Sequence, residues 1–85
     1  PLLVVEVLSP STEAYDRGAK AAHYRRIASL KEYVFVDQKT KKIEVYRRFD
    51  HNRWEFSEFG PGEDAIILEA KISVDSVYYD SMALQ

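Results

Sequence analysis

The chain has 85 residues, which allows one domain with a small core. Hydrophobic residues make up 46% and charged residues 31% of it, a composition typical of a folded globular domain and not of a disordered segment. The net charge is −2, from 12 Lys and Arg against 14 Asp and Glu, which excludes nucleic-acid binding through overall positive charge. Any contact with DNA must be local, or must come from residues outside this chain.

The chain contains no cysteine, which excludes disulfide bonds, thiolate zinc sites and thiol nucleophiles, so that a metal site would have to use carboxylates. Its apolar runs are only a few residues long, whereas a membrane helix needs about 20. No basic-then-apolar leader is present. We therefore expect a cytoplasmic protein without membrane contact. Because the sequence starts with Pro1 and an apolar run, without an initiator methionine, we interpret it as a piece of a longer protein.

The first predicted element is a β-strand over residues 2–8. The run LLVVEVL is almost continuously apolar and branched, which is typical of a central strand covered on both faces. Pro10 cannot continue a β-ladder, and the hydroxyl residues around it favour a turn. We expect the chain to leave the sheet there.

A helix is predicted next, over residues 15–29, which are rich in Ala, Arg and Lys. Asp16 is placed to cap its start, and Gly18 weakens the first turn by about 1 kcal/mol relative to Ala. Spacings of four, four and three residues put one set of side chains on a single face of this helix. They are Asp16, Lys20, Tyr24 and Ile27.

The rest of the chain predicts mainly strands. Residues 32–37 and 42–49 form strands around a hairpin loop at 38–41, and 53–59 adds a third, with Trp54, Phe56 and Phe59 facing inward. After a Gly-Pro-Gly break, 65–68 is expected as a short edge strand and 72–77 as a terminal docking segment. A strand, a helix and another strand form a crossover that makes strands 2–8 and 32–37 parallel. The expected fold class is α/β (α+β), a mixed sheet with a crossover helix and antiparallel hairpins.

Glu6 is the first candidate for chemistry, because it interrupts an apolar strand. A buried, isolated carboxylate is costly, so this side chain must be paired, be protonated, point beyond the covered part of the sheet, or bind a metal. A structural role, on a solvated face or in an ion pair, remains an alternative.

Lys20 is the second candidate, since a lysine near a carboxylate and a metal can orient or activate a water. By spacing alone, Asp16 and Lys20 form an ordinary helical ion pair worth about 0.3–0.5 kcal/mol. His23 and His51 have no partner at ligand spacing and are expected on the surface. Two basic pairs could contact phosphate, although solvated faces are the favoured interpretation. These pairs are Arg25 with Arg26 and Arg47 with Arg48.

Four segments, taken together, resemble a known family. They are PLLVVEVLSPST, YDRGAK, HYRRIASLKEYVFVD and KIEVYRR. The joint pattern resembles the Uma-type restriction endonucleases of the PD-(D/E)xK superfamily, closely over positions 1–48 and loosely beyond. The resemblance implies a restriction-endonuclease-like fold in which residues 1–85 are a single domain, the C-terminal part of a larger endonuclease-like domain.

The resemblance also implies a site. Glu6 corresponds to the acidic, metal-binding residue of the (D/E)xK half-motif, Leu8 stands at the usual lysine position, and Lys20 takes over that role from the helix. Asp16 and Tyr24 match supporting positions. Such nucleases use a divalent ion, normally Mg²⁺, to cleave DNA. The family's first catalytic aspartate precedes this chain, and Leu2 stands where the family commonly has Asp, so we expect the chain alone to be inactive.

Three functions compete on these grounds. The chain is part of a metal-dependent DNA endonuclease, or a degenerate, non-catalytic binding or dimerisation module of the same fold, or a structural domain that shares only the hairpins. The endonuclease function requires an acidic residue upstream of this chain, whereas the non-catalytic module does not. We also expect a homo-oligomer, because the first strand would expose an open, apolar edge.

Overall fold

The computed structural model describes the backbone of residues 1–83 and the side chains of residues 1–78. In chain order the described elements are β1 (Leu3–Leu8), α1 (Glu13–Tyr15), the π-helical turn η1 (Asp16–Lys20), α2 (Ala21–Arg25), β2 (Glu32–Asp37), β3 (Ile43–Arg48), β4 (Trp54–Phe59), β5 (Asp64–Ile67), β6 (Ala70–Ser73) and α3 (Val74–Ala83). Strands β1 to β4 form one sheet in that order, and β5 pairs with β6 in a second sheet. This is the mixed α+β architecture that the sequence predicts.

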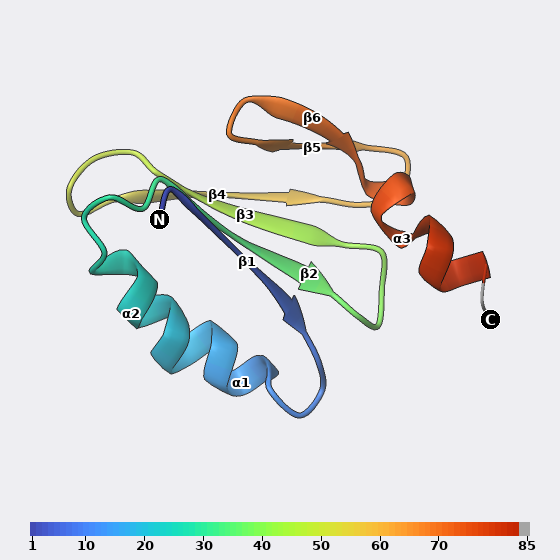
Figure 1. Cartoon of the computed structure of the whole chain (residues 1–85), viewed down its shortest axis with the longest axis horizontal. Coiled ribbons are helices and arrows are strands. Elements are labelled where there is room, and N and C mark those ends of the chain that lie inside the picture. Colours follow the sequence, from blue (N-terminus) through green and yellow to red (C-terminus); the bar gives the residue numbers. More distant parts are fainter. Residues whose placement is uncertain (84–85) are drawn as a thin grey trace.

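The crossover predicted from the sequence is confirmed. Strand β1 runs parallel to β2, with Glu6 opposite Phe35, while β2, β3 and β4 form an antiparallel meander. The helical segment between β1 and β2 covers one face of the sheet, and the β5–β6 hairpin lies on the other face (Figure 1). Because the connection returns to the same sheet, it brings the helix directly over the strand that carries Glu6.

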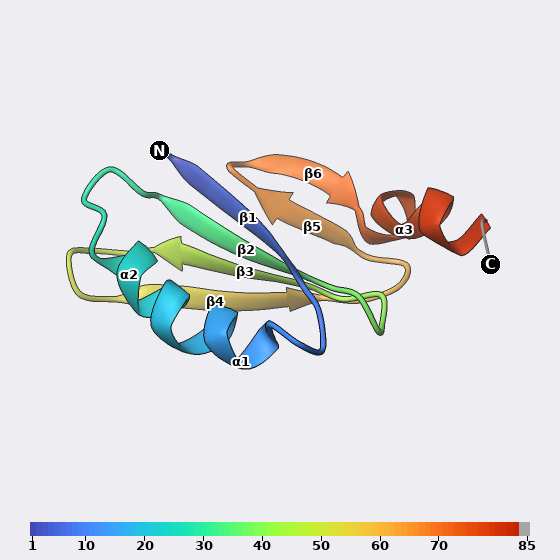
Figure 2. The same cartoon turned by 60° about the horizontal axis from the view of Figure 1, so that its bottom comes forward.

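The prediction that the Glu6 strand is central is wrong. In the described residues, β2 is the only strand that pairs with β1, and Figure 2 shows β1 at the margin of the sheet. Val5 and Val7, on the face away from the helix, are 51% and 54% exposed. The apolar run gives β1 one open edge and one largely uncovered face, whereas the most buried strands are β2 and β3.

The helical segment begins at residue 13 and ends at Arg25, earlier at both ends than the predicted range 15–29. A turn at Ser9 starts it, since the Ser9 carbonyl accepts the backbone N–H of Thr12 at 3.1 Å and of Glu13 at 2.9 Å. Asp16 is therefore not a cap. It lies inside the segment, in the π turn, and is only 3% exposed.

Two hydrophobic clusters lie on opposite faces of the sheet. The cluster under the helix contains Leu8, Ala21, Tyr24, Leu30, Tyr33 and Phe35. The cluster under the hairpin contains Val34, Ile43, Val45, Ala65, Val74 and Tyr78. Alternation along β2 and β3 sends neighbouring residues to opposite faces, which explains why short strands can serve both clusters.

The last third of the chain differs from the prediction. The short edge strand expected at 65–68 is β5, which pairs with β6 in a separate hairpin, and the expected docking segment contains the end of β6 and the start of α3. Leu68 and Glu69 form the two-residue turn, with φ values of 47° and 70°. Such turns usually contain Asn or Gly, and neither residue is present at these two positions, so this turn was hard to predict.

The aromatic residues of β4 divide differently from the prediction. Trp54 packs on the cluster under the helix and Phe59 on the cluster under the hairpin. Phe56 is 48% exposed, and the centroid of its ring lies 5.0 Å from that of Tyr46.

No helix within the described residues is long and apolar enough to cross a membrane.

Candidate active site

Glu6 meets two donors from the helix. Its side chain extends from β1 toward the helix-covered face, where Lys20 Nζ lies 3.0 Å from Glu6 Oε1. The hydroxyl of Tyr24 donates a hydrogen bond to the same oxygen. Lys20 and Tyr24 are four residues apart, so that one stripe of the helix presents both groups to the strand. The sequence predicts this grouping, and the structure shows it.

Asp16 completes the group of four. Its Oδ1 lies 3.4 Å from Lys20 Nζ, so the ammonium is shared between a carboxylate on the strand and one on the helix. The contact is more than an ordinary helical ion pair, because the Asp16 side chain is only 4% exposed while that of Lys20 is 35% exposed. Ile27, the fourth residue of the predicted stripe, packs against the hydrophobic cluster instead of joining the site.

The π turn carries two of these residues. Asp16 opens it and Lys20 closes it, and the N–H of Ala21 reaches back to the Asp16 carbonyl. Single π turns inside helices occur frequently at functional sites, since the wider turn changes how side chains are aimed. Here the wide turn joins the buried carboxylate of Asp16 to the ammonium that reaches Glu6.

The electrostatics make both helix residues proton donors. The hydrogen bond to Glu6 raises the pKa of the Lys20 ammonium above its ordinary value, although desolvation opposes it. Burial, together with the hydrogen bond to Glu6, raises the pKa of Tyr24 to about 12. Both groups are therefore protonated at neutral pH, and neither can act as a general base there. Their chemical capacity is to orient a carboxylate and to stabilise negative charge.

Glu6 retains one oxygen for another ligand. Both donors reach Oε1, and no hydrogen bond from the described residues reaches Oε2. The Glu6 side chain as a whole is 24% exposed. A single carboxylate oxygen fits Mg²⁺, which keeps several waters and takes few protein ligands. The described residues contain no group of three His, Cys, Asp or Glu side chains placed to hold a metal, so further ligands would have to come from substrate or from elsewhere in the protein.

A second ion pair, which the sequence analysis missed, lies beside the site. Arg17 donates to both carboxylate oxygens of Glu44, at 2.8 and 2.6 Å, and to Glu13 at 2.8 Å. Glu44 lies in the same cross-strand row as Glu6, with Phe35 between them. The hydrogen bonds from Arg17 lower the pKa of Glu44, against the effect of burial. In the sequence, the only sign of this ion pair is that Glu44 stands between the apolar residues Ile43 and Val45.

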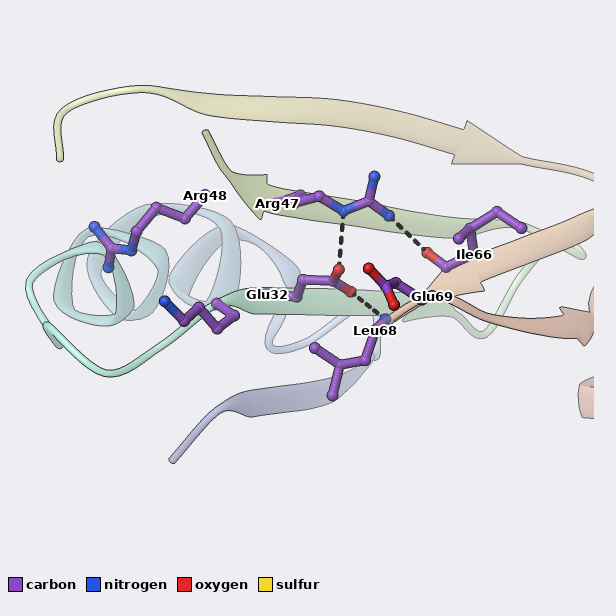
Figure 3. A pocket seen from close by; sticks show the side chains of 7 residues that line it. Glu32, Arg47, Arg48, Ile66, Leu68 and Glu69 are labelled. Atoms are coloured by element: carbon purple, nitrogen blue, oxygen red, sulfur yellow. Dashed lines mark hydrogen bonds and ion pairs between the residues drawn. The ribbon is translucent and has the colours of Figure 1, made fainter. Parts of the chain in front are cut away.

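Arg47 and Arg48 have structural contacts and do not lie on freely solvated faces as the sequence favoured. Arg47 donates to Glu32 at 2.9 Å, and Arg48 donates to the carbonyls of Leu30 and Ile27 at 2.8 Å each. Both line a cavity of about 360 Å³ next to the β5–β6 turn, which Figure 3 shows from close by. His23 and His51 are exposed, as predicted.

The cavity of Figure 3 is an anchoring site for the hairpin. Glu32 is buried, and its second oxygen accepts the backbone N–H of Leu68 at 2.9 Å. Arg47 also donates to the carbonyl of Ile66 at 3.3 Å. Both oxygens of Glu32 thus accept hydrogen bonds from the protein, whereas both donors to Glu6 reach the same oxygen.

Comparison with known proteins identifies the family of the chain. Residues 1–77 match the sequence profile of a family described as "Uma2: Putative restriction endonuclease". The chain belongs to the Uma2 family. This membership supports a nuclease-like protein in general, and it agrees with the mixed sheet and crossover helix described above.

Two Uma2-like relatives come from Synechocystis sp. (strain ATCC 27184 / PCC 6803 / Kazusa), and both are uncharacterized proteins. The protein slr1290 is 48% identical over 54 residues, which are 64% of this chain and 28% of the relative. The protein sll1609 is 37% identical over 67 residues, which are 79% of this chain and 37% of the relative. The chain thus spans about a third of the length of these relatives. Its placement in the C-terminal half of a domain stays a prediction.

Proposed function

We propose that this chain supplies the glutamate and lysine of a metal-dependent DNA endonuclease site. The observation that carries the proposal is the contact of Lys20 Nζ with Glu6 Oε1 at 3.0 Å, which leaves Oε2 open. A carboxylate with one free oxygen beside a fixed ammonium suits the cleavage of a phosphodiester, in which a metal and a cation must both approach the phosphate.

The reaction would be hydrolysis. The oxygen of a water forms a bond to phosphorus, the bond from phosphorus to one sugar oxygen breaks, and that oxygen leaves with the electron pair and takes up a proton. The attacking water gives up a proton to solvent or to a base outside the described residues. A bound divalent ion would polarise the phosphate and lower the pKa of the water. Glu6 would hold the ion through Oε2, and Lys20 would stabilise the charge that develops on the phosphate oxygens.

The Asp16 and Tyr24 contacts have a positioning role in this proposal. Asp16 holds the Lys20 ammonium from the helix side, and Tyr24 fixes the Glu6 carboxylate through Oε1. A site held by such supporting contacts keeps its geometry when substrate binds. The missing ligands are assigned to the rest of the protein, including an aspartate upstream of residue 1.

The test uses the intact protein that contains this chain, with a DNA duplex and Mg²⁺. Glu6→Gln and Lys20→Ala should each lower the cleavage rate by at least about 10²-fold, as expected when a group that acts on developing charge is lost. The matched controls are Glu55→Gln and Lys41→Ala, which remove the same charges from exposed ion pairs outside the site. Circular dichroism should show that every variant is folded. A wild-type rate for Glu6→Gln would contradict the proposal.

A second candidate is a non-catalytic DNA-binding or dimerisation module. It is favoured by one observation, namely that the described residues hold no group of three metal-binding side chains. In that case the intact protein would bind DNA or self-associate, but it would not cleave DNA with Mg²⁺ or Mn²⁺. A cleavage assay, run beside a binding titration and a mass measurement in solution, would therefore separate the two functions.

A further inference from the structure

The six arginines of the chain divide into two groups by their partners. Those that lie within 4.0 Å of a carboxylate are Arg17, Arg47 and Arg53. For the other three, the described residues provide no carboxylate at that distance. All three line one cavity of about 390 Å³, at the end of α2 and beside the β3–β4 loop. Its lining consists of Arg25, Arg26, Ala28, Arg48, His51 and Asn52, with no acidic residue.

Two of these guanidinium groups are held in place by neutral partners. Arg25 donates to the hydroxyl of Tyr33 at 2.9 Å, and burial raises the pKa of that phenol, so that it stays neutral. Arg48 donates to main-chain carbonyls and lies over the ring of Trp54, 4.3 Å from its centroid. Partners of this kind fix the position of a cation without neutralising its charge. The cavity therefore offers preorganised donors whose positive charge is not matched by a carboxylate.

Arg26 and the loop residues give the cavity its open side. Arg26, His51 and Asn52 are exposed, and no side-chain hydrogen bond from the described residues engages Arg26. In a chain with a net charge of −2, this concentration of positive charge is local. Planar guanidinium groups around a small cavity match the oxygens of a phosphate group.

We propose that this cavity binds a phosphate group of a nucleic-acid backbone, outside the Glu6–Lys20 site. Arg26 and Arg25 would donate to the phosphate oxygens, with Asn52 as a neutral donor. Arg26 directly follows the helical segment that carries Lys20. The nucleic-acid source rests on the proposed function, whereas binding of a phosphate group to the cavity does not.

The first experiment measures binding of the intact protein to a fluorescent DNA duplex, by anisotropy in EDTA and at several NaCl concentrations. Arg25→Gln and Arg26→Gln should each weaken binding about tenfold, as for loss of one charged hydrogen bond. Each should also reduce the slope of log K against log [salt] by about 1. The matched control is Arg53→Gln, in the same loop region but paired with Asp50 at 2.8 Å, which should change the affinity less than twofold.

The second experiment uses inorganic phosphate as the probe. In NMR spectra of the intact protein, phosphate should shift the backbone amide signals of Arg26 and Asn52 in a saturable way, and the Arg25→Gln/Arg26→Gln double variant should abolish these shifts. Absence of such shifts in the wild type would overturn the phosphate site. Saturable phosphate binding, combined with unchanged DNA binding by the double variant, would overturn the nucleic-acid assignment.

The outcome is separable from that of the proposed function. Arg26 is exposed, and its side chain makes no hydrogen bond or ion pair with the described residues, so that Arg26→Gln should report binding even if Arg25→Gln destabilises the protein. Glu6→Gln should abolish cleavage and keep the DNA affinity within about twofold, since it leaves the cavity intact. If Glu6→Gln cleaves normally while Arg26→Gln loses affinity, the endonuclease site is misassigned and the phosphate cavity stands.

Discussion

The two carboxylate oxygens of Glu6 differ in their hydrogen bonds. Lys20 and Tyr24 both donate to Oε1, and two donors on one oxygen restrict how the carboxylate can move. A carboxylate that is fixed in this way loses little conformational freedom when it binds an ion or a substrate. The supporting hydrogen bonds should therefore affect the site more than their small contribution to folding suggests.

Tyr24→Phe tests the contribution of the hydroxyl. The variant should lose about 1–2 kcal/mol of unfolding free energy at pH 7, because a hydrogen bond to a charged group is removed while the ring stays in the cluster. Cleavage by the intact protein should fall without being abolished, since Lys20 still holds Glu6. Urea unfolding and initial cleavage rates are the measurements.

The raised pKa of Tyr24 adds a pH signature to this variant. Its ordinary pKa is 10.0, and in the folded chain it is about 12, so the stabilisation is complete below pH 10 and is lost as the pH rises to 12. Tyr24→Phe should therefore lose less stability than the wild type between pH 9 and pH 11. An identical alkaline loss in both proteins would show that Tyr24 does not carry this effect.

Arg17→Met tests the buried pair next to the site. Glu44 would keep only Lys42, at 3.6 Å, so the unfolding free energy should fall by about 2–3 kcal/mol. The Arg17→Met/Glu44→Leu double variant should recover most of this loss, because no charge is then left buried. Thermal unfolding of the three proteins checks this prediction, and an equally unstable double variant would contradict it.

Acid titration gives an independent check on Glu44. Because Arg17 lowers its pKa from the ordinary value of 4.5, the pair stabilises the fold above about pH 4.5, and this stabilisation is lost as the pH falls through the lowered pKa. Glu44→Gln should flatten the acid side of the stability curve. Its stability at pH 7 should be lower than that of the wild type.

At the scale of single residues, sequence reasoning found what depends on local spacing. Glu6 stood out as one charge in an apolar strand, and Lys20 and Tyr24 followed from the period of the helix. The Arg17–Glu44 pair and the contacts of Arg48 depend on which strands become neighbours and in which register, and a single sequence does not contain this information. The metal-binding and catalytic roles of these residues stay predictions.

At the scale of elements, the π turn makes the helix irregular where the site residues begin. Gly18 lies in the middle of this turn, and a Cβ added there meets no atom within 4 Å. The glycine is thus not required by any close neighbour. Glycine gives the unfolded chain extra conformational entropy, which is lost on folding, as for glycine in any helical segment.

Gly18→Ala should stabilise the protein by about 0.5–1 kcal/mol for this reason. The control is Gly62→Ala, since Gly62 has a φ of 81°, a value that side chains rarely adopt, and this variant should lose stability by about 1 kcal/mol or more. Differential scanning calorimetry would show melting temperatures shifted in opposite directions. Destabilisation by Gly18→Ala would mean that the wide turn itself depends on glycine.

The elements predicted best are those with an uninterrupted pattern. The strand Glu32–Asp37 has the predicted bounds, and β3 and β4 differ by one residue at each altered end. The helix ends were wrong because they depend on contacts beyond local propensity: the turn at Ser9 starts it early, and the chain after Arg25 turns toward Arg48. The β5–β6 hairpin was missed because its turn lacks the usual residues.

At the scale of the whole molecule, β1 has an open, apolar edge within the described residues. Leu2, Val5 and Val7 are each more than half exposed, and one side of the strand has no partner in the described residues. Such an edge is prone to pair with another chain. We therefore predict that the 85-residue chain, prepared by itself, forms dimers or larger assemblies at high micromolar concentration.

Light scattering of this chain and of a Val5→Lys/Val7→Lys variant tests that prediction. The two lysines place charge on the exposed face of β1, so the variant should be monomeric while the helix-facing side of the strand is unchanged. A folded wild-type chain with a monomeric mass would count against the prediction. The variant Lys39→Glu/Lys71→Glu, with altered charge at exposed positions outside β1, serves as control.

The position of β1 at the margin of the sheet also affects how often the contact between Glu6 and Lys20 breaks. A strand with one neighbour can detach while the β2–β3–β4 meander stays folded, and such partial openings need less free energy than global unfolding. The parallel pairing of β1 also closes a long crossover, which makes it a late event when the chain folds. Amide protons of β1 should thus exchange with deuterium faster than those of β3. Each opening would carry Glu6 away from Lys20, so that the proposed site would be transiently disrupted in a molecule that remains folded.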